Sequence, residues 1–243
     1  MLIKVVNPNT TWSMTEQIGS CARAAAGTGT LVQAVSPEMG PASIESHYDE
    51  ALSVPGLLEE IAKGETDGVD GYVVACFGDP GLDAARELAR GPVLGIAQAA
   101  MHTATLLGRS FAVVTTLERT VGRAWDLVQQ YGMGGSCRSV RACGIPVLEL
   151  ESDPRTRAVV TAECRRALNE DRADVVVLGC AGMADLCAEI SAEIGAPVVD
   201  GVAAATVLVE GLVRLGLRTA VHGEFSSPPA KPYSGLMGGF AVR

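Results

Sequence analysis

The chain has 243 residues, of which 48% are hydrophobic, 4% aromatic and 19% charged, and its formal net charge is −9 at pH 7. The negative balance argues against a protein that binds nucleic acid through a basic face. The apolar runs are shorter than the roughly 20 residues that a membrane helix needs, so no membrane association is expected. Seven cysteines, with no basic and apolar leader at the start, predict reduced thiols in the cytoplasm.

Apolar and helix-like runs alternate along the chain, which is typical of parallel sheets covered by helices and predicts an α/β fold. In chain order the expected elements are a strand at 2–6, a helix at 13–25, a strand at 31–35, a helix at 45–62, a strand ending at 76, a helix to about 89, a strand at 92–96, a helix at 97–107, a strand at 111–115, a helix at 118–131, a strand at 138–142, a helix at 153–169, a strand at 174–178, a helix at 183–194, a strand at 197–200 and a helix at 202–215. Residues 224–243 form a terminal extension, rich in Pro, Gly and Ser up to 240, that is ordered only if it packs on something.

Two stretches of the chain are copies of each other. Residues 69–76 end an apolar strand at Cys76, and residues 173–180 end one at Cys180; each is followed by a helix-like run and a Pro-Val strand. The repeat predicts two pseudo-symmetric lobes, each a mainly parallel sheet flanked by helices. We assign residues 1–97 with 208–243 to the first lobe and residues 98–207 to the second.

The two cysteines are the strongest functional signal. Ligands of α/β sheets bind beyond the carboxyl ends of strands, where both thiols are expected. Taken alone, Cys76 is as compatible with a buried structural thiol as with a reactive one. Its partner Cys180 at the equivalent position favours two thiols that face each other across a cleft, one removing a proton and the other returning one. A helix N-terminus expected after each cysteine would stabilise a thiolate or a substrate oxyanion.

Three motifs carry a resemblance to a known family: Asn7-Pro8-Asn9-Thr10, the run from Ala75 to Gly81, and the run from Leu178 to Met183. With Gly40-Pro41, they make the whole chain resemble the hydantoin and allantoin racemase branch of the aspartate/glutamate racemase superfamily. The resemblance implies a cleft between two lobes, a small-molecule substrate, no cofactor, no metal and a homo-oligomer. It also implies that one cysteine thiolate deprotonates C5 of a hydantoin ring while the other thiol protonates the opposite face.

In amino-acid racemases of the superfamily, the motifs at the two thiols resemble Cys-Asn-Thr and Cys-Thr-His. This chain has Cys76-Phe77-Gly78 and Cys180-Ala181-Gly182 at these places. The loss of polar side chains leaves backbone N–H groups for the carbonyl of a neutral ring, which fits a hydantoin and disfavours glutamate or aspartate. The expected substrate-binding residues are Asn9, Pro41, Phe77, Gly78, Thr115, Thr116, Ala181 and Gly182.

Several of these residues have a structural alternative. Asn9 could instead form a turn that caps the next helix, and Thr115 or Thr116 could be a helix N-cap. Asp79, followed by Pro80, is expected to cap the helix after Cys76 and not to be a general acid.

Two alternative functions stay open at this point. One is a maleate-isomerase or malonate-decarboxylase-like enzyme of the same superfamily, which the two intact cysteine motifs disfavour. The other is a two-lobed sensor that binds a small molecule without turnover. The sequence leaves open the C5 substituent, the enantiomer that each cysteine handles and the number of subunits.

Overall fold

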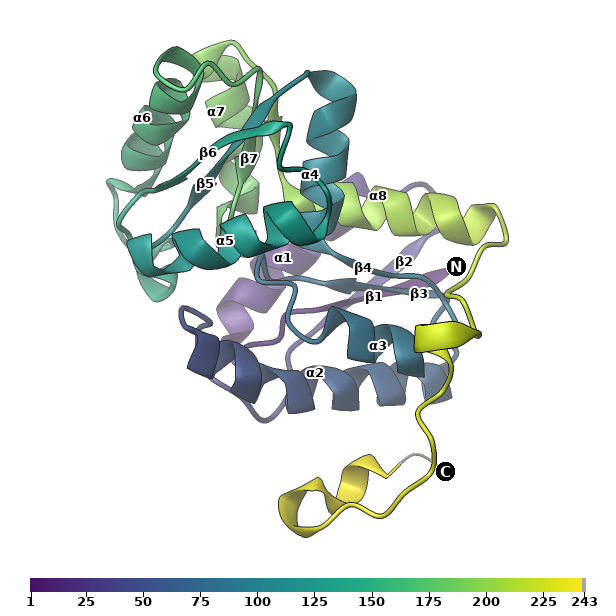
Figure 1. Cartoon of the computed structure of the whole chain (residues 1–243). Helices are drawn as coiled ribbons and strands as arrows, with labels where there is room; N and C mark the ends of the chain where they lie inside the picture. The colour runs from purple at the N-terminus through teal and green to yellow at the C-terminus, as the bar shows by residue number, and fades with distance from the viewer. Residues whose placement is uncertain (242–243) are drawn as a thin grey trace.

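A computed structural model describes residues 1–241, in which the alternating runs form two four-stranded parallel sheets (Figure 1). The first sheet has the order β2-β1-β3-β4, with β1 (Leu2–Val6), β2 (Leu31–Val35), β3 (Gly71–Val74) and β4 (Val93–Gly95). The second has the order β6-β5-β7-β8, with β5 (Phe111–Thr115), β6 (Cys137–Ala142), β7 (Val175–Leu178) and β8 (Val198–Val199). The two orders correspond strand for strand, so the predicted α/β class with repeated lobes is confirmed. We call the β1–β4 sheet with its helices the first lobe and the β5–β8 sheet with its helices the second.

The central strands are continuous apolar runs because helices cover both faces of a parallel sheet. All four residues of β3 and all four of β7 are buried. The register pairs Val6 with Val74 and Val114 with Leu178. The carboxyl ends of β1 and β3 therefore lie level with each other, as do those of β5 and β7, and the residues just beyond them share one edge of each sheet.

The main helices are α1 (Trp12–Ala25), α2 (His47–Asp67), α3 (Leu82–Leu88), α4 (Ile96–Leu107), α5 (Glu118–Gln130), α6 (Thr156–Asn169), α7 (Cys187–Ile194) and α8 (Gly201–Arg214). Short 3-10 helices cover Val147–Glu149 (η1), Ala181–Leu186 (η2), Gly223–Phe225 (η3) and Gly235–Phe240 (η4). None of the helices within residues 1–241 combines the length and the apolarity required to cross a membrane.

One hydrophobic core joins the two lobes. It contains Val5 and Val73 of the first sheet, Val113 and Val177 of the second, and Ile18 of α1, all fully buried. Figure 1 places α1, α4 and α8 where the lobes meet, and α4 and α8 pack on each other. The lobe boundaries expected at 97/98 and 207/208 fall within these two helices.

The helix after Cys76 begins later than expected. Helix α3 starts at Leu82, and its N-cap is Gly81 with a φ of 63°, so Asp79 does not cap it. The Asp79 carboxylate instead accepts the first-turn N–H groups of α4, from Ala97 (3.1 Å) and Gln98 (2.9 Å). The N-cap position of α4 is Gly95, which has no side chain for this task. Asp79 is therefore a helix cap, but for a helix that begins 17 residues further along the chain.

The C-terminal segment leaves the body after α8. Helix η3 lies along α3, where the Arg86 guanidinium sits 5.7 Å from the Phe225 ring centroid. Beyond it the chain runs away from both lobes, and η4 stands apart from them in Figure 1. Leu236 is 99% exposed there.

Candidate active site

The residues that follow β1, β3, β5 and β7 line one cavity of about 160 Å³ between the lobes. The lining comprises Asn7, Asn9, Met14, Ile44, Glu45, Ser46, His47, Glu50, Ala75, Cys76, Phe77, Gly78, Thr115, Thr116, Arg119, Thr120, Arg123, Ala124, Val147, Gly179, Cys180 and Ala181. Equivalent strands of the two sheets thus contribute equivalent positions. This arrangement follows from the rule that α/β sheets bind ligands beyond the carboxyl ends of their strands.

The structure brings the two repeat cysteines together. Cys76, from the first lobe, and Cys180, from the second, both line the cavity, and both are free thiols of intermediate exposure. The cavity therefore holds one thiol from each half of the repeat.

Burial makes both thiols hard to ionise. Loss of solvation raises the pKa of Cys76 well above that of an ordinary thiol and raises the pKa of Cys180 to about 12. The backbone N–H groups of Gly78 and Gly182 oppose this effect by stabilising the respective thiolates. A negative charge on Cys180 raises the pKa of Cys76 further. The pair therefore favours at most one thiolate at a time.

Helices do follow the two cysteines, as expected, but neither is an α-helix that begins at the thiol. After Cys76 the chain makes a turn, closed by a 2.9 Å hydrogen bond from the Asp79 N–H to the Cys76 carbonyl. After Cys180 the 3-10 helix η2 begins at Ala181. Each thiol is supported by the N–H group of a nearby glycine, and α-helix dipoles do not start at either position.

Six of the eight expected substrate-binding residues line the cavity, namely Asn9, Phe77, Gly78, Thr115, Thr116 and Ala181. Pro41 and Gly182 are not part of the lining. The Pro41 carbonyl accepts the Thr10 N–H at 3.0 Å, so this residue shapes the loop beside the site. A side chain on Gly182 would lie 3.7 Å from the Cys180 sulfur, which places Gly182 directly beside that thiol.

The structure also shows whether Asn9, Thr115 and Thr116 cap helices, the alternative to substrate binding. Asn9 Oδ1 accepts N–H groups from Thr11 (2.9 Å) and from the Asn7 side chain (2.9 Å). The N-cap of α1 is Thr11, so Asn9 forms the expected turn without capping the helix. The N-cap of α5 is Leu117, so neither Thr115 nor Thr116 has that role.

Sequence reasoning missed Asn7. It is 1% exposed, it is the first residue after β1, and its Nδ2 donates to Asn9 and to Thr15, each at 2.9 Å. Both Asn7 and Thr116 line the cavity, where their side chains can meet a ligand. Asn7 directly follows β1 and lies level with Ala75, the residue before Cys76, and this place at the carboxyl end of a strand was the signal that could have found it.

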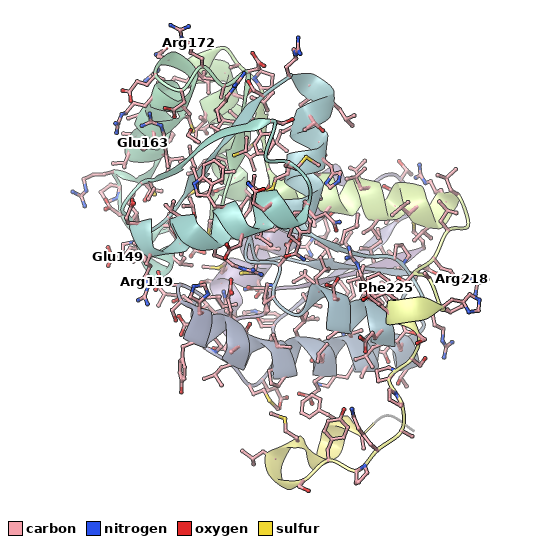
Figure 2. The ribbon with its side chains drawn as sticks, viewed as in Figure 1. Arg119, Glu149, Glu163, Arg172, Arg218 and Phe225 are labelled. Carbon is pink, nitrogen blue, oxygen red and sulfur yellow. The ribbon has the colours of Figure 1, made fainter. Side chains whose placement is uncertain are left out.

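Charged residues that cross between the lobes were missed as well. Arg123 of α5 reaches the first lobe, where its Nε lies 3.2 Å from Glu50 Oε1. Glu45 Oε1 accepts the Val147 N–H of the second lobe at 2.7 Å. Figure 2 shows Arg119, also a lining residue, at the outer edge of the junction between the lobes. No local pattern in the sequence indicates that these residues meet.

Comparison with known proteins supplies the family. A family model described as Asp/Glu/Hydantoin racemase matches residues 3–209. The chain belongs to this family. The hydantoin racemase of Rhizobium meliloti is 48% identical over 97% of this chain and 98% of its own length. That of Pseudomonas sp. (strain NS671) is 46% identical over 99% of this chain and 97% of its own length.

Solved structures agree with this assignment. The allantoin racemase from Klebsiella pneumoniae superposes with a TM-score of 0.97 at 50% identity, covering 99% of both chains. An arylmalonate decarboxylase superposes with a TM-score of 0.65 at 16% identity, covering 90% of this chain and 96% of its own, and shares the fold alone. The chain is a racemase and therefore an isomerase, so a sensor without turnover is set aside.

Proposed function

We propose that this racemase inverts C5 of 5-substituted hydantoins, a class that includes allantoin, without a cofactor or metal ion. The observation that carries the proposal is the pairing of Cys76 and Cys180, one from each lobe, in a single cavity. Relatives named hydantoin racemase and a structural neighbour named allantoin racemase support the substrate class. A decarboxylase or maleate isomerase gains no support from a shared fold.

In the proposed reaction one cysteine is a thiolate and the other a thiol. The thiolate takes the C5 proton, so an S–H bond forms as the C–H bond breaks, and the electron pair spreads onto the C4 oxygen. The second thiol then delivers its proton to the opposite face of C5. The net result is an inverted carbon and a negative charge that has moved from one sulfur to the other.

The raised pKa values of Cys76 and Cys180 suit this chemistry. A carbon next to a carbonyl is a weak acid, and proton transfer from it is easier to a more strongly basic thiolate. Burial makes the thiolate scarce, but it also makes each thiolate a stronger base. A substrate that displaces water from the cavity would also strengthen the hydrogen bonds to the developing oxyanion.

The polar groups around the thiols suit a neutral ring. The Asn7 side-chain carbonyl can accept a ring N–H, and the Thr116 hydroxyl can donate to a ring carbonyl. The backbone at Phe77 and Ala181, beside the two thiols, supplies further donors for the C4 oxygen.

Polarimetry of single enantiomers tests the substrate class, with allantoin and several alkyl and aryl hydantoins as substrates. We expect racemisation of at least one of these series. We also expect Cys76→Ser and Cys180→Ser each to lower net racemisation by about 10²–10⁴-fold, because a serine hydroxyl replaces neither the acid nor the base. In heavy water the two variants should exchange the C5 hydrogen of opposite enantiomers with retained configuration.

A variant that racemises at the parent rate, or two variants that exchange the same enantiomer, would contradict the one-thiol-per-face assignment. An enzyme that racemises free glutamate or aspartate in preference to any hydantoin would contradict the substrate class. Cys21→Ser, which removes a thiol of α1 outside the cavity lining, is the matched control and should leave both readouts unchanged.

We also propose that the protein is a cytoplasmic homo-oligomer. The seven cysteines are all free thiols, which suits a reducing compartment.

An apolar hollow of about 550 Å³ lies between α4 and α8, next to Leu215 (74% exposed). A second copy of the chain is the occupant that we propose, because the C-terminal segment leaves the body just after α8 and carries the exposed Leu236 away from its own lobes. Light scattering should report more than one chain per particle, and Leu215→Asp should reduce that number.

A further inference from the structure

The two thiols sit on different lobes, so their separation depends on contacts between the lobes. Cys180 follows β7 of the second lobe, and Cys76 follows β3 of the first. The loop after Cys76, residues 77–81, has no α-helix of its own to fix it, because α3 begins only at Leu82. Something else must hold this loop in place if the cavity is to keep a fixed width.

Helix α5 of the second lobe holds this loop at two adjacent residues. The Arg123 Nη2 donates to the Gly78 carbonyl at 2.7 Å. The Tyr131 hydroxyl, at the C-cap of the same helix, donates to Asp79 Oδ2 at 2.6 Å. Both contacts cross from the second lobe to the first, and both lie within three residues of Cys76.

Asp79 occupies a buried and strained position, and the hydrogen bond from Tyr131 and the charge of Arg123 stabilise its carboxylate there. It is 4% exposed, it has a φ of 45° although it is not glycine, and burial raises its pKa to about 6. Gly95 leaves room for it, since a Cβ there would lie 2.1 Å from the Asp79 carboxyl carbon. Backbone strain and a buried carboxylate beside a catalytic loop point to a functional constraint.

Capping of α4 alone does not account for the hydroxyl of Tyr131. The first-turn N–H groups of Ala97 and Gln98 already occupy both carboxylate oxygens of Asp79. The additional donor comes from the lobe that carries Cys180, and Arg123 approaches the same loop from the same helix.

We infer that Tyr131 and Arg123 are positioning residues for Cys76: through Asp79 and the Gly78 carbonyl, they fix the loop after Cys76 against the second lobe and so set the distance between the two thiols. This inference rests on the proposed two-thiol function. Release of the loop moves Cys76 relative to substrate, whereas Cys180, on the lobe that carries α5, keeps its place. A misplacement of about 1 Å at a reacting group lowers its rate by up to about 100-fold.

Tyr131→Phe removes the hydroxyl and keeps the ring, so it is the variant of choice. The readout is C5 hydrogen exchange in heavy water, measured in two backgrounds. In Cys180→Ser only the Cys76 thiol remains, and in Cys76→Ser only the Cys180 thiol remains. We expect Tyr131→Phe to slow exchange by about 10- to 100-fold in the first background and by less than about twofold in the second. Tyr233→Phe, in the C-terminal segment, is the matched control and should change neither rate.

A second readout does not depend on turnover. Alkylation of each thiol by iodoacetamide is followed by mass spectrometry of the peptides. We expect Tyr131→Phe to raise the rate at Cys76 at least threefold, because the loosened loop admits the reagent, and to leave the rate at Cys180 unchanged. Arg123→Met should act in the same direction, and Arg123→Lys should restore part of the parent behaviour because it keeps a donor for the Gly78 carbonyl.

Equal effects of Tyr131→Phe on the two thiols, or no effect on either readout, would overturn the inference. If Cys76→Ser racemises at the parent rate, the two-thiol function fails, and the alkylation readout still decides whether α5 positions the loop. The unfolding midpoint in urea separates both outcomes from a general loss of structure.

Discussion

At the scale of single residues, the two thiols are rarely ionised, but each thiolate that forms is a strong base. Burial raises the pKa of Cys76 and brings that of Cys180 to about 12, so little thiolate is present near neutral pH. Hydrogen bonds from the backbone N–H groups of Gly78 and Gly182 lower the two pKa values and so increase the thiolate fraction. Under the proposed two-thiol mechanism, a small fraction of the molecules is active near neutral pH, and each of them carries a strong base.

The expected consequence is a rate that rises with pH. Below the pKa of a thiol, its thiolate fraction increases about tenfold per pH unit, so kcat/KM should rise steeply between about pH 7 and 9. At higher pH the rate should fall when the second thiol also loses its proton, and both limbs belong to the coupled pair. Initial rates by polarimetry, corrected for the uncatalysed reaction, measure this profile. A flat profile, with a deuterium isotope effect proving that proton transfer limits the rate, would remove the thiols from the mechanism.

At the scale of elements, α8 joins the two lobes. Its N-cap Asp200 accepts N–H groups from Val202 (3.0 Å) and Ala203 (2.8 Å), and it is 8% exposed. At its first residue, a Cβ on Gly201 would lie 2.6 Å from the Ile96 carbonyl, so the starts of α4 and α8 are in close contact. The cap of this one helix therefore stabilises the junction of the lobes.

Asp200→Ala should lower the free energy of unfolding by about 1–2 kcal/mol, because two first-turn N–H groups lose their acceptor. Asp200→Asn keeps an oxygen acceptor and should cost less. Asp185→Ala, an exposed carboxylate of η2, is the control and should change stability by no more than about 0.5 kcal/mol. Urea denaturation followed by circular dichroism measures all three. Equal losses for Asp200→Ala and Asp185→Ala would show that the cap contributes nothing of its own.

At the scale of the whole molecule, the shared core makes the two lobes one folding unit. Residues of both sheets, with α1, α4 and α8, belong to a single buried cluster. Neither lobe can unfold alone without exposing part of the core of the other. The site between them depends on both, since each supplies one thiol.

We therefore expect a single unfolding transition. The chain has two tryptophans, Trp12 in α1 and Trp125 in α5. Trp125→Phe leaves a fluorescence reporter in the first lobe, and Trp12→Phe leaves one in the second. In urea the two reporters should give midpoints that match the circular dichroism midpoint of the same variant. Separate transitions in the two variants would mean that the lobes unfold independently.

The sequence by itself determined the helices and strands and indicated the pair of cysteines that lines the cavity. The alternation of apolar and helical runs predicted the strands and helices of two parallel sheets. This was possible because hydrophobic periodicity and local hydrogen bonding depend on residues close together in the sequence. The repeat around Cys76 and Cys180 indicated both thiols, since equal positions in equal units reach equal places in the fold. The repeat also indicated Thr116 as a site residue, but Asn7 was not predicted from it.

Tertiary structure alone decided which distant groups meet. The sequence predicted Asp79 as the cap of the next helix because Pro80 follows it. In the structure its carboxylate fits against Gly95, which has no side chain, and accepts N–H groups of α4. Arg123 and Tyr131 reach the loop after Cys76 only because α5 packs across the junction of the lobes. Contacts of this kind join residues 45 and 52 positions apart, and no local propensity records them, because their free energy is realised only when both lobes are folded.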